Sequence, residues 1–245
     1  MARIDDLLEA QLKTIGPKPA DTAARPDKKR YSEQVSQVVA LAIGQELRHR
    51  GMREARPATP GDLDQSGAER RMAGGIGAKK VDVTWATEES GLLLGISIKS
   101  INFRDTRTKN FQKNLTNRRG DMLMEAVTLH RRFPYAVLGG LFFLDQGAEH
   151  DHTGKRRSTF VNAHARMKLF TGRNDPAGRD EQYERLYLVL LEVSTAKVGL
   201  RAFEVGKPHE EIPMDHILGG FIELLAERNP DFYEVFEGGL ISVNA

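Results

Sequence analysis

KKVDVTWATEESGLLLGISIKS, residues 79–100, predicts two strands that are joined by a tight turn. The runs 81–87 and 92–103 combine β-branched and apolar residues with alternating polarity, as half-buried strands do. The residues from Glu88 to Gly91 separate the two runs with turn-forming chemistry. Strands joined by so short a connection pair antiparallel, so we expect a β-hairpin here.

Two charged residues lie within this apolar hairpin, Asp82 on the first strand and Lys99 late on the second. In an alternating strand Ser97 and Lys99 share one face, and Ile98 lies on the other. A carboxylate and an ammonium on buried strands are costly unless they pair with each other or bind a ligand. Metal-dependent phosphoryl chemistry uses such a pair, because the carboxylate holds the metal and the lysine handles the water or the phosphate charge. A purely structural ion pair is the alternative.

The order of elements around the hairpin predicts an α/β fold, with a central mixed β-sheet of about five strands flanked by helices. We expect residues 1–30 to form an N-terminal helix and a linker, with the helix packed remotely or on a partner subunit. We expect residues 31–245 to form one domain, with a core at about 31–145 that carries this charged pair and a C-terminal part, 146–245, that completes the sheet and contributes to recognition. The expected elements are helices at 2–15, 31–50, 117–132, 158–171 and 213–228, strands at 136–144, 187–194 and 198–206, and loops at 52–78 and 145–157.

Composition excludes several classes of protein. The chain has 245 residues and no cysteine, which excludes a disulfide scaffold, a thiolate zinc site and a cysteine nucleophile. Its 36 Lys+Arg nearly balance 34 Asp+Glu, so net charge alone does not indicate a nucleic-acid partner. No apolar run is long enough for a membrane span and no signal peptide is evident, so we expect a cytoplasmic protein that does not bind membranes.

The distribution of charge is more informative than its sum. From residue 99 to residue 119 the segment has one acid, Asp105, and a run of basic residues: Lys99, Arg104, Arg107, Lys109, Lys113, Arg118 and Arg119. A basic sector on a nearly neutral chain is typical of an anion-binding surface. Arg118 and Arg119 lie at a helix N-terminus, where the helix dipole disfavours cations unless they meet an anion. A solvated basic loop is the alternative.

The pattern Asp82 followed by Ser97-Ile98-Lys99, with a helix before it and a helix and a strand after it, resembles the PD-(D/E)xK nuclease superfamily, the restriction-endonuclease-like fold. The resemblance covers residues 31–145. The chain departs from the family pattern at two positions: Val81 replaces proline, and Ser97 replaces the second acid.

The resemblance implies that another acid completes the site. Asp121 and Glu125 on the following helix are candidates, as are Glu33 and Glu46 on the preceding one, and we favour Glu33 and Glu125. Each could instead be a solvated or salt-bridged carboxylate.

The implied function is a magnesium-dependent DNA endonuclease of the type II restriction-enzyme kind, with Mn²⁺ as a substitute for Mg²⁺. Asp82, Glu125 and the carbonyl of Ile98 would hold the metal, with Ser97 beside them. Lys99 would orient or deprotonate the attacking water, or neutralise the phosphorane. The basic residues listed above would bind double-stranded DNA.

The implied partners are a second copy of the chain and a cognate methyltransferase or defence-system protein. The helix at 2–15 and the last helix are the candidate dimer interfaces.

Three alternatives stay open: a non-catalytic or repair-associated DNA-binding member of the fold, a structural protein in which Asp82 and Lys99 form an ion pair, and an RNA substrate whose bases stack on Phe103 and Phe111. We further expect His130 to make a cap or core contact, with a phosphate contact as the alternative.

Overall fold

The computed structural model describes residues 2–64, 66–195 and 197–243. In these residues a six-stranded sheet has the order β3-β4-β5-β6-β7-β8, with β4–β5 and β5–β6 parallel and the other pairs antiparallel. Its strands are β3 (Val83–Thr87), β4 (Gly91–Ile101), β5 (Val137–Asp145), β6 (Arg185–Val193), β7 (Val198–Glu204) and β8 (Glu211–Ile212). The predicted α/β class with a central mixed sheet is confirmed, with six strands rather than about five.

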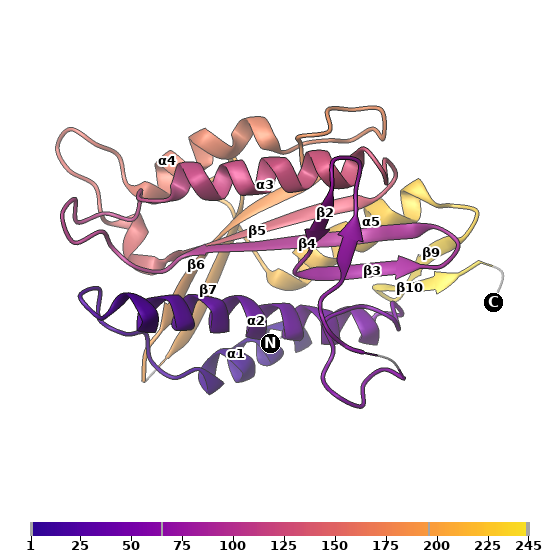
Figure 1. The fold of residues 1–245 in the computed structure, drawn as a ribbon, viewed down its shortest axis with the longest axis horizontal. Coiled ribbons are helices and arrows are strands. Elements are labelled where there is room, and N and C mark those ends of the chain that lie inside the picture. Colours follow the sequence, from indigo (N-terminus) through magenta and orange to yellow (C-terminus); the bar gives the residue numbers. More distant parts are fainter. Residues whose placement is uncertain (1, 65, 196, 244–245) are drawn as a thin grey trace.

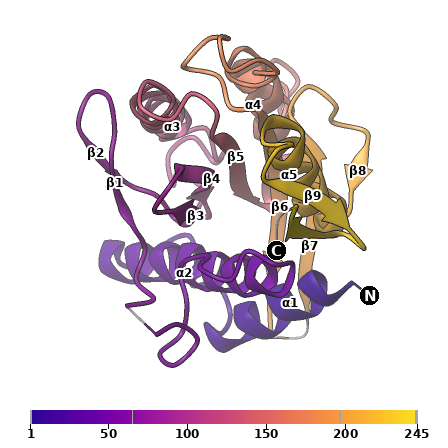
Figure 2. The ribbon, with the colours of Figure 1, turned by 90° about the vertical axis from the view of Figure 1, so that its right-hand side faces the viewer.

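Helices cover both faces of the sheet (Figures 1 and 2). One face is covered by α1 (Arg3–Thr14), α2 (Arg25–His49) and α5 (Met214–Arg228), and the other by α3 (Leu115–His130) and α4 (Thr159–Met167). Short 3-10 turns are present at η1 (Gln146–Glu149) and η2 (Lys168–Phe170). The buried side chains form two hydrophobic clusters, one on each face, so the sheet has a core on both sides.

The alternation of β4 sorts its side chains between these two cores. Ile96 and Ile98 belong to the cluster under α1, α2 and α5, whereas Ile101 belongs to the cluster under α3 and α4. Because side chains two residues apart share a face, Ser97 and Lys99 project toward α3. The predicted assignment of faces on this strand is confirmed, and it brings the lysine to the same side as the following helix.

Two regions of the chain differ from the prediction. α2 begins at Arg25 rather than at about residue 31, and Pro26 lies in its first turn, where a missing N–H costs nothing. Within the predicted loop 52–78, β1 (Arg71–Ala73) and β2 (Ala78–Lys80) form a separate hairpin. Gly75 N–H donates to the carbonyl of Thr128 on α3 at 2.8 Å, so this hairpin packs beside α3 (Figure 1).

The N-terminal helix packs within the chain. Ile4, Leu8 and Leu12 of α1 are fully buried in the core that α1 shares with α2 and α5. The apolar face that we expected to find remote or on a partner is therefore covered by this chain itself. At the other end of the chain, β9 (Tyr233–Phe236) and β10 (Gly239–Ser242) form a hairpin that the sequence did not predict.

None of the described helices combines the length and the apolar character that a membrane span needs.

Candidate functional site

Asp82, Lys99 and Glu125 meet on the side of the sheet that faces α3. Lys99 Nζ lies 3.2 Å from Asp82 Oδ2 and 3.4 Å from Glu125 Oε2. The backbone N–H of Ile98 donates to Asp82 Oδ2 at 2.6 Å, which fixes the carboxylate beside the strand. The result is an ammonium held between two carboxylates that come from different elements.

Local sequence explains how the three residues converge. Val83 pairs with Ile96, so Asp82, one residue before β3, reaches the backbone of Ile98 on the neighbouring strand. Glu125 lies on the buried stripe of α3 together with Met122, Ala126 and Leu129, at helical spacing. Its position on that stripe points the carboxylate toward the sheet.

The cluster is mostly buried, and Asp82 is its most exposed member. The side-chain exposures are 23% for Asp82, 16% for Lys99 and 7% for Glu125. Burial alone would lower the pKa of Lys99, but the charges of Glu125 and Asp82 outweigh it and raise that pKa. Burial raises the pKa of Glu125 despite the attraction of Lys99. Lys99 is therefore an ammonium at neutral pH in the metal-free protein, which suits a charge-neutralising role better than that of a base.

Ser97 supplies a further oxygen at the same place. It is 1% exposed, and its hydroxyl lies near the Glu125 carboxylate and the Tyr183 hydroxyl, where hydrogen bonding to it acts to lower the pKa of both groups. Two carboxylates, the Ile98 carbonyl and this hydroxyl form an all-oxygen donor set, which fits a hard divalent cation such as Mg²⁺.

The number of carboxylates limits how such an ion would be held. No group of three or more His, Asp or Glu suited to a metal is present in the described ranges. Protein carboxylates would therefore supply two ligands at this site, Asp82 and Glu125. Mg²⁺ commonly keeps several waters or substrate oxygens, so a two-carboxylate site is compatible with it.

The other candidate acids lie elsewhere. Glu33 has an exposed side chain and pairs with Lys29 at 3.6 Å, because it occupies the outer face of α2. Glu46 is buried but is bound by Arg3 of α1 and by Arg50, the residue that follows α2. Asp121 is exposed at the outer side of α3. Of the four acids that we considered, Glu125 is the one that the structure brings to Asp82 and Lys99.

The basic segment after β4 is an organised loop. Asp105 accepts hydrogen bonds from the backbone N–H groups of Arg107 and Thr108 and pairs with Lys113 at 2.6 Å. The bond from Lys113 holds the pKa of the Asp105 carboxyl well below its usual range. Lys113, expected to bind DNA, is thus already neutralised by the acid of its own loop.

The remaining cations of this segment fall into two groups. Arg104 stacks on the ring of Phe111, Arg119 stacks on another phenylalanine ring, and Arg118 pairs with a carboxylate on its own helix. Arg107 and Lys109 are exposed, and within the residues described their side chains form no ion pair. These two are the most available for an external anion.

Phe111 is fully buried, so the expectation that it could stack on a base is wrong.

The linker before α2 holds the start of the basic segment in place. Lys18 Nζ bonds to Asp145 Oδ2 at 2.7 Å and to the carbonyl of Asn102 at 3.1 Å, and Asp21 accepts the backbone N–H of Arg104 at 3.1 Å. Lys18 N–H also donates to a carbonyl at the end of β6. Residues 15–24 therefore cross the carboxyl ends of the parallel strands β4, β5 and β6.

The sequence analysis did not identify two residues near the site, Tyr183 and Glu184. Tyr183 is 2% exposed and donates from Oη to the carbonyl of Met122 on α3 at 3.1 Å. Burial raises its pKa well above the usual value, and the nearby charge of Glu125 adds to the effect. No local pattern in the sequence identifies these two residues, because their partners lie far away along the chain.

The site combines a protonated lysine, two carboxylates and a buried hydroxyl, and the basic loop follows it along the chain. Such an arrangement can bind a divalent cation and stabilise a phosphate. No protein-family model, curated protein or solved structure matches the chain.

Proposed function

We propose that this protein is a magnesium-dependent DNA endonuclease that hydrolyses phosphodiester bonds. The observation that carries the proposal is the position of Lys99 Nζ between Asp82 and Glu125, in a cluster whose side chains are partly exposed. A cationic donor beside two carboxylates is what phosphodiester hydrolysis requires, because negative charge must be held at the metal and also neutralised on the phosphorane.

Each residue has a separate task in this mechanism. Asp82, Glu125 and the Ile98 carbonyl would hold Mg²⁺, with Mn²⁺ as a substitute, and the ion would supply Lewis-acid stabilisation of the transition state. The ammonium of Lys99 donates hydrogen bonds to the attacking water or to a phosphate oxygen and offsets the developing charge. Ser97 contributes a hydroxyl donor or acceptor at the position where related patterns have an acid. Glu33 has no part, since it faces solvent.

Double-stranded DNA is the substrate that the basic loop favours. Arg107 and Lys109 are free to contact phosphates, and phosphate contacts supply most of the sequence-independent affinity for DNA. Restriction of foreign DNA, with a cognate methyltransferase or another defence protein as partner, is the cellular role that we infer from the resemblance.

A homodimer would supply the two sites that cutting both strands requires. The apolar faces of α1 and α5 are used inside the chain, so they cannot form its interface. Exposed apolar side chains gather instead on the C-terminal hairpin, at Phe232, Val235, Phe236, Ile241 and Val243. Acidic neighbours such as Glu234 repel DNA from this surface. We therefore infer that a second copy of the chain binds here. Sedimentation equilibrium tests the idea: a dimer that Phe236→Glu dissociates supports it, and a wild-type monomer at every concentration refutes it.

The decisive experiment is cleavage of supercoiled plasmid at low salt, in Mg²⁺ and in EDTA. We expect the wild type to cut in Mg²⁺ and both Lys99→Met and Glu125→Gln to lose cutting. Lys207→Met is the matched control, because Lys207 is an exposed lysine paired with Glu204 outside the site. Equal cutting by the wild type and Lys99→Met would overturn the assignment of the site.

A second candidate is a DNA-binding protein of the same fold, repair-associated or otherwise, that does not cut. Ser97 favours it, because the pattern's second acid is absent at that position. This candidate predicts DNA binding that Arg107→Gln weakens, with no cleavage in Mg²⁺ or Mn²⁺. Cleavage of RNA and not of DNA under the same conditions would show that the substrate is RNA.

A further inference from the structure

The dipeptide Tyr183-Glu184, just before β6, contacts α3 at two separate points. Tyr183 Oη donates to the carbonyl of Met122 at 3.1 Å, and Glu184 Oε2 lies 3.2 Å from His130 Nε2. Met122 is three residues before Glu125 and His130 is five residues after it. The two contacts therefore bracket the part of the helix that carries the site carboxylate.

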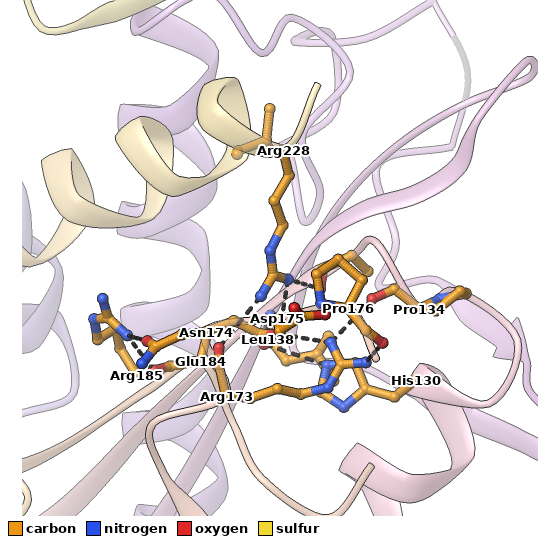
Figure 3. A network of polar contacts seen from close by, with 12 residues as sticks. His130, Pro134, Leu138, Arg173, Asn174, Asp175, Pro176, Glu184, Arg185 and Arg228 are labelled. Carbon is orange, nitrogen blue, oxygen red and sulfur yellow. Dashed lines mark hydrogen bonds and ion pairs between the residues drawn. The ribbon is translucent and has the colours of Figure 1, made fainter. Parts of the chain in front are cut away.

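Glu184 is anchored to the rest of the protein independently of α3. Its side chain is fully buried and accepts hydrogen bonds from Arg173 at 3.0 Å, Arg228 at 2.8 Å and the backbone N–H of Leu138 at 2.7 Å (Figure 3). Burial alone would raise its pKa, but the hydrogen bond and charge of His130 and the charge of Arg228 lower it, so Glu184 is ionised. One carboxylate thus joins β5, α5 and the loop before β6 to the last residue of α3.

Tyr183 fills the space between the sheet and the helix beside the site. Gly140 on β5, which pairs with Ser97, leaves space for the side chains around the ring: a Cβ at that position would lie 2.4 Å from Leu186 Cδ1 and 2.8 Å from the Met122 methyl group, and in ordinary contact with the Tyr183 ring at 3.5 Å. The buried ring therefore lies beside the strand position next to Ser97, and its hydroxyl group is bonded to α3.

We propose that Tyr183 and Glu184 are positioning residues that hold α3 so that the Glu125 carboxylate stays beside Lys99. Two attachment points eight residues apart, about 12 Å along a helix, fix both the rotation and the translation of that helix. A rotation by one residue would turn Glu125 by about 100° and remove it from the site. The inference rests on the proposed function in one respect, which is that Glu125 is a metal ligand.

Tyr183→Phe tests the proposal because it removes only the hydroxyl group. The matched control is Tyr187→Phe, a buried tyrosine on β6 whose ring packs on Phe221, on the opposite face of the sheet. Amide hydrogen exchange by mass spectrometry reports the position of α3, and Mn²⁺ binding followed by electron paramagnetic resonance reports the carboxylates.

In Tyr183→Phe we expect exchange in residues 122–130 to accelerate about fivefold, the factor that corresponds to one buried hydrogen bond. The Mn²⁺ dissociation constant should rise about tenfold, as happens when a residue supporting a metal ligand is removed. In cleavage assays the Mn²⁺ concentration for half-maximal rate should rise while KM for DNA stays constant. Tyr187→Phe should leave all three unchanged.

Unchanged exchange and Mn²⁺ affinity in Tyr183→Phe would overturn the proposal, and so would equal effects in Tyr187→Phe or acceleration spread evenly over the chain. If Tyr183→Phe does not fold, His130→Asn, which removes the α3 contact of Glu184 and leaves its pairs with Arg173 and Arg228 in place, gives the same readouts. If the wild type binds no Mn²⁺, the metal-dependent mechanism of the proposed function is wrong. Amide exchange in α3 would still show whether Tyr183 holds the helix.

Discussion

Lys99→Met should make the stability of the protein depend on a divalent cation. The substitution keeps most of the side-chain length but removes the ammonium that lies 3.2 Å from Asp82 and 3.4 Å from Glu125. At an effective dielectric constant of about 20, each of these attractions is worth about 5 kcal/mol before desolvation is counted. The variant would hold two carboxylates near each other, one of them almost fully buried, without a counter-charge.

The net cost is smaller than the sum of the attractions because the variant no longer buries a lysine. Removing one partner of a buried ion pair costs about 3 to 5 kcal/mol, and the 23% exposure of the Asp82 side chain favours the lower end. A loss of about 3 kcal/mol corresponds to about 6 to 12 °C in Tm for a chain of this size. Mg²⁺ at ten times its Kd would restore about 1.4 kcal/mol.

The assay is urea unfolding followed by circular dichroism, in EDTA and in excess Mg²⁺, on the wild type, Lys99→Met and the exposed control Lys207→Met. We expect Lys99→Met to lose stability in EDTA and to regain part of it in Mg²⁺. The control should follow the wild type within about 0.5 kcal/mol. A Lys99→Met protein as stable as the wild type in EDTA would refute the reasoning, since Lys99 would then not be compensating the two acids.

Three further predictions follow from other sites. Glu184→Gln should cost about 3 to 5 kcal/mol in chemical unfolding at neutral pH, because two buried guanidinium groups lose their carboxylate; a loss below about 1 kcal/mol would contradict this. Burial, with a smaller contribution from a neighbouring histidine, lowers the pKa of His164 to about 4, so the wild type should lose about 2 kcal/mol between pH 7.5 and pH 5, as the unfolded state takes up the proton first. His164→Asn should lose less over that interval, and an equal loss would count against the assignment. Replacing both Arg107 and Lys109 with Gln should reduce the slope of log K for DNA against log salt by about 1.8, which filter binding at several salt concentrations would reveal.

The hairpin and its chemistry could be predicted from sequence because their signals are local. Alternating polarity identified β3 and β4, and the short turn between them implied that Asp82 and Lys99 would approach each other. The resemblance made Glu125 a candidate, and the structure places it on the buried stripe of α3. Helical spacing could have excluded Glu33. It lies two residues from each of the buried residues Tyr31 and Val35, so it is on the exposed side of its helix.

The residues that support the site could not be predicted, because their contacts are distant along the chain. Tyr183 meets its partner on α3 across 61 residues, and Glu184 reaches His130 across 54. β1 and β2 are three residues each with mostly exposed side chains, too short for a periodic pattern. His130 is a buried contact at the end of its helix, as expected, yet nothing near it in sequence indicated its carboxylate partner.

The crossing segment at residues 15–24 has a consequence for how the protein is made. Lys18 binds Asp145, 127 residues later, and Asp21 binds the backbone of Arg104, 83 residues later. During synthesis these residues leave the ribosome before Arg104 and Asp145 do, so their contacts cannot form until β5 has been made. Contacts of such long sequence separation slow folding. The basic loop should therefore become ordered late, so an incomplete chain would not yet present its cations in the arrangement that the finished protein uses.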